Sequence, residues 1–177
     1  DDPVRTMVAT EIGELAFQRY FVAEQCRPAV TGIRFEGAAA ARPSPGFMAA
    51  LGRDDLAGVI LCPSNPYLSI DPILALPGVR AAIRACGAPV TAVSPVVGGK
   101  AIKGPTAKMM RELGIEPGVA AIARHYEGLV DRLVIDRADA DAGAVLPCPV
   151  LATQSVMVSD ADRIALARAT LAMLEPA

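Results

Sequence analysis

The sequence lacks the features that mark several common classes of protein. Its 177 residues include no tryptophan and a single histidine, and the formal net charge is −2. Without a surplus of basic residues or a run of Lys and Arg, the chain has little with which to hold a nucleic-acid backbone. We therefore expect no nucleic-acid partner.

Signals for export and for membrane insertion are also missing. No N-terminal signal pattern is present, and the longest uncharged stretch, residues 142–159, contains two prolines and several polar residues. We interpret this stretch as a loop that leads into a buried strand, because it is barely long enough to cross a bilayer. The four cysteines form no CxxC pair and no metal-type spacing, which favours reduced, buried thiols. We expect a cytoplasmic protein that has no membrane partner.

Apolar residues, by contrast, make up 53% of the chain, enough for a sizeable core. Ala57 to Cys62 predicts a buried strand, and Val79 to Cys86 has helical spacing that ends at Gly87. The same unit then repeats, with further strands predicted at 89–93 and 150–153, a short helix and strand within 129–135, and helices at 105–113, 118–125 and 159–174. This alternation predicts an α/β fold, a three-layer Rossmann-like and mostly parallel sheet with helices on both faces.

The first 55 residues are less regular. They predict a strand at 6–10, an amphipathic helix at 15–25, a strand at 30–35 and a Pro-rich connection at 42–46. We expect residues 1–55 to form an inserted or edge α+β subdomain, and residues 56–177 to form the Rossmann-like nucleotide-binding portion.

Two strand ends carry unusual loops, and ligands of parallel sheets bind beyond the carboxyl ends of the strands. The first loop contains Ser64, Asn65 and Ser69 just before a predicted helix. Their hydroxyl and amide groups suit a phosphate or a base edge. They equally suit a turn whose polar side chains satisfy their own backbone, so both interpretations stay open.

The second loop runs from Ser94 to Pro105. Gly98 and Gly99 would let the backbone approach a ligand closely, and Lys100 or Lys103 would supply a positive charge. The loop matches neither a Walker A motif nor GxGxxG, so it predicts an anion or phosphate site without specifying a class of enzyme.

Two further groups of residues favour structural interpretations. His125, the one histidine, is expected to have a structural role near a helix end, since no recognisable nucleophile motif accompanies it. A set of carboxylates resembles a metal cluster on paper, but its position in a polar loop favours a solvated surface; its members are Asp131, Asp136, Asp139 and Asp141.

Taken together, the two loops resemble the 2-phospho-L-lactate transferase family of coenzyme F420 biosynthesis. The similarity rests on Pro63-Ser64-Asn65-Pro66 followed by Ser69-Ile70, and on the whole segment 93–105; Phe17 to Val22 and Ala123 to Tyr126 are similar as well. The resemblance implies transfer of a phospholactyl-type unit (phospholactate, phosphoenolpyruvate or phosphoglycerate) from a guanosine-diphospho donor to the deazaflavin Fo, with release of GMP. It also implies assistance by Mg²⁺ and a homodimer.

On this resemblance the two loops would hold the guanosine diphosphate, while no catalytic side chain is assigned. The candidate nucleotide- and phosphate-binding residues are Pro63, Ser64, Asn65, Ser69, Ser94, Gly98, Gly99, Lys103 and Gly104. Two departures from the family pattern are Asp71, where Gly is expected, and Gln154-Ser155, where Asp-Thr is common.

The resemblance also bears on how much of the family domain is present. The family's glycine-rich turn and its acidic segment are not found, so the N-terminal part of the domain, with the Mg²⁺ ligands, is expected to lie outside these residues. No metal site is therefore expected in this chain, and the isolated 177 residues are expected to be inactive. Two alternatives stay open: a non-catalytic nucleotide-sugar-binding regulator of the same fold, and a structural or degenerate protein.

Overall fold

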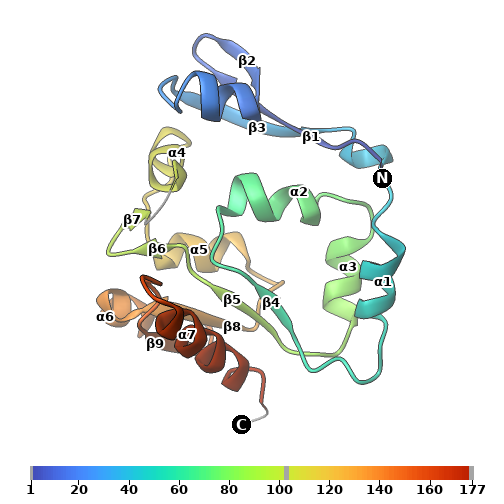
Figure 1. The fold of residues 1–177 in the computed structure, drawn as a ribbon, viewed down its shortest axis with the longest axis vertical. Coiled ribbons are helices and arrows are strands. Elements are labelled where there is room, and N and C mark those ends of the chain that lie inside the picture. Colours follow the sequence, from blue (N-terminus) through green and yellow to red (C-terminus); the bar gives the residue numbers. More distant parts are fainter. Residues whose placement is uncertain (1, 102–103, 176–177) are drawn as a thin grey trace.

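The structure, a computed structural model, describes residues 2–101 and 104–175 and contains two main sheets (Figure 1). The larger sheet consists of β4 (Val59–Leu61), β5 (Val90–Val93), β8 (Arg132–Asp136) and β9 (Val150–Thr153) in that order. All three neighbouring pairs are parallel. The α/β fold class predicted from the alternating pattern is confirmed.

Helices cover both faces of this sheet, which makes three layers. Six α-helices lie between residues 45 and 143. They are α1 (Pro45–Leu51), α2 (Asp71–Leu74), α3 (Val79–Ala85), α4 (Thr106–Glu112), α5 (Val119–His125) and α6 (Ala140–Gly143). On one face Leu133 and Ile135 pack in a single core with residues of α1 to α5. On the other face Val93 and Val134 pack against Leu166 of α7 (Asp160–Ala172). Alternate residues of a strand point to opposite faces, so the all-apolar strands predicted this two-sided burial.

The smaller sheet is antiparallel and comes from the first 36 residues. It consists of β1 (Arg5–Thr10), β2 (Gly13–Ala16) and β3 (Val30–Glu36), in the order β2-β1-β3. The helix predicted over 15–25 is wrong in its first part, because Leu15 and Ala16 pair with β1. A tight turn makes this pairing possible, since Gly13 adopts a φ of 111° and the Thr10 hydroxyl donates to its carbonyl.

A wide helical turn follows β2. In η1 (Arg19–Ala23) the N–H of Glu24 donates to the carbonyl of Arg19, five residues back, as in a π-helix. A second π-turn, η3 (Pro66–Ile70), lies after β4, where the N–H of Ile70 donates to the carbonyl of Asn65. Such turns are rare and often occur at functional sites.

The two sheets are joined through a second core. Val8, Tyr20 and Val30 of the N-terminal segment pack with Leu68 of η3 and Met109 of α4. Polar contacts reinforce the junction, because Glu112 of α4 accepts the backbone N–H of Val30 at 3.0 Å. Lys108 of the same helix donates to the carbonyl of Pro28 at 3.0 Å.

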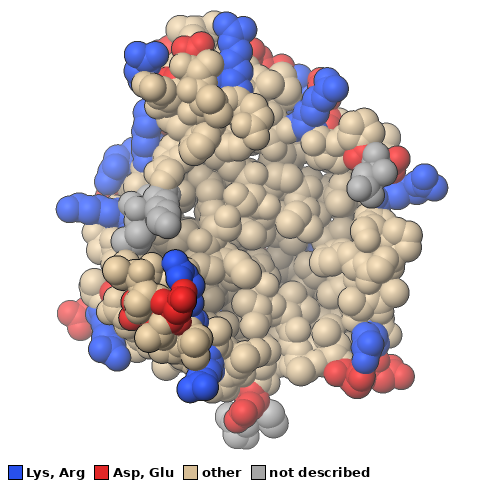
Figure 2. Space-filling view, in the orientation of Figure 1, with Lys and Arg blue, Asp and Glu red and all other residues tan. Residues whose placement is uncertain are grey.

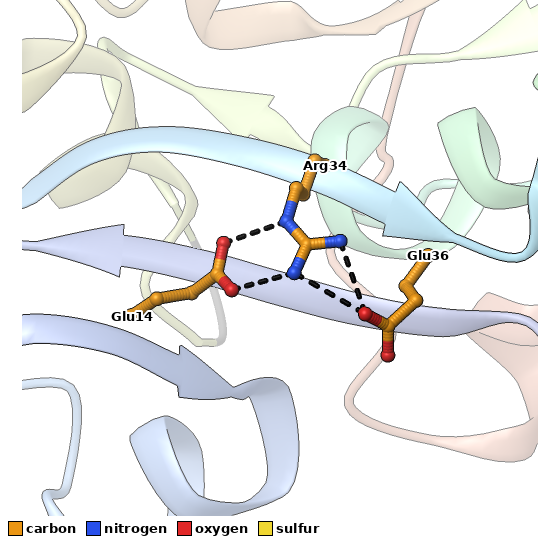
Figure 3. Close-up of polar contacts among 3 residues, drawn as sticks. All are labelled: Glu14, Arg34 and Glu36. Carbon is orange, nitrogen blue, oxygen red and sulfur yellow. Dashed lines mark hydrogen bonds and ion pairs between the residues drawn. The ribbon is translucent and has the colours of Figure 1, made fainter.

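The outer face of the antiparallel sheet is polar. Arg34 of β3 donates through Nε and Nη2 to both carboxylate oxygens of Glu14, at 2.7 and 2.6 Å, and contacts Glu36 at 3.3 Å (Figure 3). All three side chains are largely exposed, so this network lies on a solvated surface.

Several short elements were not predicted. Helix α1 begins at Pro45, near the end of the Pro-rich connection predicted over 42–46, and the Ser44 side chain caps its N-terminus. The loop after β5 contains a small hairpin of β6 (Val96–Val97) and β7 (Lys100–Ala101). Two 3-10 turns, η2 (Ala38–Ala40) and η4 (Arg137–Asp139), complete the described elements. Across the described ranges, no helix is both long enough and apolar enough to traverse a membrane.

Candidate functional site

A cavity of about 400 Å³ lies at the carboxyl ends of the parallel strands, next to the N-terminal segment. Its residues follow β4, β5 and β9, and come also from η1, η3 and the start of α4. They are Phe17, Phe21, Pro63, Ser64, Asn65, Leu68, Ser69, Ser94, Pro95, Val97, Gly104, Pro105, Thr106, Ser155, Val156 and Met157. This is the edge at which ligands of parallel sheets bind.

The two predicted loops meet in this cavity. Six of the nine candidate binding residues line it: Pro63, Ser64, Asn65, Ser69, Ser94 and Gly104. Since β4 and β5 are parallel neighbours, the segments that follow them emerge at the same edge of the sheet. This topology explains how residues about 30 positions apart come together.

Asn65 shapes the first loop from within. Its side-chain Oδ1 accepts the backbone N–H groups of Tyr67 and Leu68, at 3.0 and 3.1 Å, and so caps the π-turn η3. Of the two interpretations of this loop, the turn-forming one therefore describes Asn65, while Ser64 and Ser69 face the cavity.

Ser94 shapes the second loop in a similar way. Its buried hydroxyl both donates to the carbonyl of Val96 and accepts the N–H of the same residue, at 3.1 Å each. This local bond fixes the turn from β5 into β6.

Two of the described candidate residues do not line the cavity. Gly98 and Gly99 occupy the tip of the β6–β7 hairpin with φ of 55° and 70°, values that favour glycine at both positions of a two-residue turn. The N–H of Gly98 donates to Asp139 at 2.9 Å. The structure thus gives both glycines a role in turning the chain, and their contact with a ligand stays a prediction. Lys103 lies outside the described residues.

A third strand end contributes to the cavity and was missed. Ser155, Val156 and Met157 follow β9, whose neighbour β8 ends at Asp136. The carboxylate of Asp136 accepts the Ser155 N–H at 2.8 Å and the Ser155 hydroxyl at 3.0 Å. The sequence did contain a signal for these residues. A strand predicted at 150–153 in a parallel sheet brings the residues that follow it to the edge where the other two loops lie.

Two of the acidic residues expected on a solvated surface are buried, which corrects that prediction. Asp136 and Asp139 are 7% and 8% exposed. Burial favours a higher pKa for Asp136, but hydrogen bonds from the N–H groups of Ala138 and Ser155 and from the Ser155 hydroxyl outweigh it, and the net pKa is lowered. Both carboxylates therefore serve as anchors for the loops around the cavity.

The apolar part of the lining also escaped prediction as a binding wall. Phe17 and Phe21 come from the N-terminal segment, with ring centroids 5.5 Å apart. In the sequence, the segment from Phe17 to Val22 predicts part of a helix and resembles the family, but it indicates no binding role. Its contribution depends on how the N-terminal segment packs, which local patterns do not encode.

His125 and Asp71 lie outside the cavity lining. His125 is the last residue of α5, as its predicted helix-terminal role requires, and its Nε2 is 2.9 Å from Oδ1 of Asp71. Arg80 Nη2 is 3.9 Å from the same oxygen, and the Tyr67 ring packs edge-on against the imidazole. The side chain of Asp71, the departure from the family pattern, thus contacts His125 and Arg80 and is not part of the cavity lining.

Carboxylate, imidazole and thiol side chains do not cluster in the described part of the chain. Among residues 2–101 and 104–175, no group of three or more His, Cys, Asp or Glu side chains is placed to hold a metal ion. Among the residues that the structure describes, the cavity lining contains no charged side chain. Figure 2 agrees with this picture, since charged residues gather around the outline of the face shown and uncharged residues occupy its centre.

Comparisons with known proteins identify relatives along almost the whole chain. A family model described as 2-phospho-L-lactate transferase CofD matches residues 1–171. The phosphoenolpyruvate transferase of Streptomyces griseus is 38% identical over 183 residues, covering 99% of this chain and 57% of that protein. The 2-phospho-L-lactate transferase of Methanopyrus kandleri is 37% identical over 178 residues, covering 99% of this chain and 56% of that protein.

A solved structure shares the fold. Protein BH3568 from Bacillus halodurans aligns with a TM-score of 0.61 at 15% sequence identity, covering 95% of this chain and 58% of that one. At this identity the similarity concerns the fold alone. The chain spans a little over half the length of each relative described here.

Proposed function

Because the chain belongs to the 2-phospho-L-lactate transferase family, we propose that it is part of an enzyme that transfers a phospholactyl-type unit to the deazaflavin Fo. The donor in this proposal is a guanosine-diphospho derivative of phospholactate, phosphoenolpyruvate or phosphoglycerate. We base the proposal on the cavity. In it, the loop that follows β4 and the loop that follows β5, both predicted to bind phosphate, come together at neighbouring strand ends.

The proposed reaction is a displacement at phosphorus. A ribityl hydroxyl of Fo forms a new O–P bond to the phosphate of the three-carbon acid, the bond from that phosphorus to the bridging oxygen breaks, and GMP leaves with the oxygen. Such reactions depend mainly on alignment of the two oxygens and on stabilisation of the charge that develops on the phosphates.

The described residues contribute binding and orientation to this reaction. Ser64, Ser69 and Thr106 line the cavity, and hydroxyl groups of this kind can donate hydrogen bonds to phosphate oxygens. Asn65, Ser94 and Asp136 fix the backbone around them by the bonds described above. We assign no step to Mg²⁺, since the described residues offer no set of ligands for it.

The test is an assay of the complete gene product with Fo and each of the three guanosine-diphospho donors. We expect GMP release that depends on Fo, with the transferred unit found on the ribityl chain by mass spectrometry. Absence of GMP release with all three donors would overturn the proposal.

A binding experiment separates the transferase from the nucleotide-sugar-binding regulator. GDP and a UDP-sugar are titrated separately, and a preference for the UDP-sugar would favour the regulator. For the double variant Ser64→Ala, Ser69→Ala we expect Kd for GDP to rise about a hundredfold, since the charged phosphates lose one hydrogen bond with each hydroxyl that is removed. Thr31→Ala, at an exposed position on β3, is the matched control and should leave Kd unchanged.

A further inference from the structure

A group of side chains outside the cavity lining contacts the turn η3, which carries Ser69 into the lining. The group consists of the imidazole of His125, the carboxylate of Asp71 and the ring of Tyr67. We propose that His125 is a positioning residue of the candidate site: through Asp71 it holds η3 in its wide form and so sets the position of Ser69. This inference rests on the proposed function and adds to it a residue that acts from outside the cavity.

The first argument is that two hydrogen-bonding patterns compete within η3. The carbonyl of Asn65 accepts the N–H of Ser69 at 2.9 Å, as in an α-helix, and also the N–H of Ile70 at 3.3 Å, as in a π-helix. The N–H of Asp71 donates to the carbonyl of Pro66, five residues back, which is again the π-type pattern. Because π-type turns are rare, we infer that contacts from outside the turn keep it wide. A change to the α-type pattern would close the turn one residue earlier and alter the direction of Ser69.

The second argument is that His125 contacts both η3 and the residue that closes it. Its Nε2 lies 2.9 Å from Oδ1 of Asp71, and since an ionised carboxylate only accepts hydrogen bonds, the ring donates through Nε2. The ring of Tyr67, within η3, packs edge-on against the imidazole, with the ring centroids 4.8 Å apart. The side chain of Asp71 is therefore tied to α5, while its backbone N–H closes the wide turn.

The third argument is that α5 is a fixed base for this contact. Val119 and Ile122 of the helix are almost fully buried in the core that α1 to α5 share. The side chains of His125 and Asp71 are 17% and 20% exposed, so water competes weakly for the bond between them. Arg80 of α3 is 3.9 Å from the same carboxylate oxygen, too far for a hydrogen bond, and its side chain is half exposed. The short contact of the carboxylate is thus the one with His125.

The first test compares two variants of the complete gene product. His125→Phe keeps a ring against Tyr67 but donates no hydrogen bond, whereas His125→Gln keeps a side-chain N–H donor of similar reach. We expect Kd for GDP to rise about fivefold in His125→Phe, because a smaller fraction of the protein has the wide turn, and to stay within about twofold in His125→Gln. Arg124→Gln, at the exposed neighbouring position of α5, is the control and should leave Kd unchanged. Calorimetry gives the constants at a temperature at which each variant is folded.

A second pair of variants removes the same bond from its other end. Asp71→Asn keeps an acceptor oxygen and should bind GDP within about twofold of the unsubstituted protein, whereas Asp71→Ala should raise Kd about fivefold. The double variant His125→Phe, Asp71→Ala should bind no more weakly than either single variant, since both substitutions remove one shared interaction. These variants decide the question even if His125→Phe does not fold.

Two further readouts separate positioning from a general loss of stability. In crystals of His125→Phe we expect the N–H of Asp71 to donate to the carbonyl of Tyr67, four residues back, in place of Pro66; in His125→Gln the bond to Pro66 should remain. In the transfer assay we expect KM for the guanosine-diphospho donor to rise about fivefold in His125→Phe and kcat to stay within about twofold, because Ser69 binds the donor in the ground state and the transition state alike.

Three results would overturn the inference. A folded His125→Phe protein with a wide η3 and an unchanged Kd for GDP would show that His125 only stabilises the fold, and the proposed function would stand. Equal losses of affinity in His125→Phe and His125→Gln would show that the donated hydrogen bond is not the cause. Failure of the unsubstituted gene product to bind GDP and to release GMP would remove the proposed function and this inference together.

Discussion

The parallel sheet and the antiparallel sheet border the same cavity but are stabilised differently. The central strands of the parallel sheet are buried on both faces, with Leu133, Val134 and Ile135 almost inaccessible to solvent. The antiparallel sheet packs on one face only and exposes the Arg34 network on the other. In the parallel sheet the strand ends supply polar groups to the cavity, while the antiparallel unit supplies aromatic carbon. We infer that the position of the polar lining residues depends on the parallel sheet, and that the position of the apolar lining residues depends on the junction between the two sheets.

The largest effect is expected at the buried carboxylate of the parallel sheet. Asp136→Ala removes the acceptor of three hydrogen bonds, from the Ala138 N–H, the Ser155 N–H and the Ser155 hydroxyl. We expect the free energy of unfolding to fall by about 3 kcal/mol at pH 7, because buried donors are left without partners. Chemical denaturation followed by circular dichroism measures this loss, and Asp141→Ala, at an exposed position of α6, is the control.

The same variant gives a pH test with a definite sign. The pKa of Asp136 is lowered in the folded protein, so its contribution to stability is present above the unfolded pKa of about 3.9 and is lost as the pH falls through the folded value. The difference in stability between the unsubstituted protein and Asp136→Ala should therefore shrink below about pH 4. A difference that grows on acidification would contradict the assignment of these hydrogen bonds to the ionised carboxylate.

A smaller, local effect is expected at the junction. Glu112→Ala leaves the Val30 N–H without its acceptor and removes the ion pair with Lys108. We expect the amides of β1 and β3 to exchange about five- to tenfold faster, while those of β5 and β8 are unchanged, because opening of the antiparallel unit is a local event. Hydrogen exchange followed by mass spectrometry measures both, and Glu116→Ala, at an exposed neighbouring position, is the control. Equal acceleration in both sheets would show that the two units open together.

The smallest effect is expected on the outer face of the antiparallel sheet. Arg34→Gln removes the bonds to Glu14 and Glu36, all between exposed groups, so the melting temperature should fall by no more than about 2 °C. The hydrogen bond from Arg34 lowers the pKa of Glu14, so this contribution should be present above pH 4.5 and disappear as the carboxylate protonates at lower pH. Thermal melts at pH 7 and pH 3, repeated at 1 M salt, provide the check; an effect that survives both acid and salt would contradict an ionic origin.

The same contrast explains which parts of the fold could be predicted from sequence. The strand at 89–93 was predictable because a strand buried on both faces is a continuous apolar run, and the partly exposed edge strands at 57–62 and 150–153 are apolar runs as well. The terminal helix was predictable because the capping box of Ser159 and Asp162 marks its start. In the antiparallel unit, residues 13–16 have apolar spacing compatible with a helix, and pairing with β1 overrides that local preference.

The candidate site shows the same limit. Ser64, Ser69 and Ser94 were predictable because each follows a recognisable strand in one sheet. Phe17 and Phe21 were not predicted as a wall, because they reach the cavity only through packing of Tyr20 and Leu68 in the second core. Asp136 was predicted to lie at the surface because its neighbours in the sequence are polar, whereas two of its three hydrogen bonds come from Ser155, 19 residues away.

The two π-turns bordering the cavity make its walls sensitive to chain length as well as to residue type. Removing one residue between Phe17 and Phe21 would narrow the wide turn of η1 and change the angular position of one ring relative to the other. The same deletion between Asn65 and Ser69 would change the position of Ser69, which lines the cavity, relative to the side chain of Asn65, which caps η3. Helical phase is thus a determinant of this site: a variant that keeps every lining side chain but is one residue shorter in either turn would direct part of the lining away from the ligand.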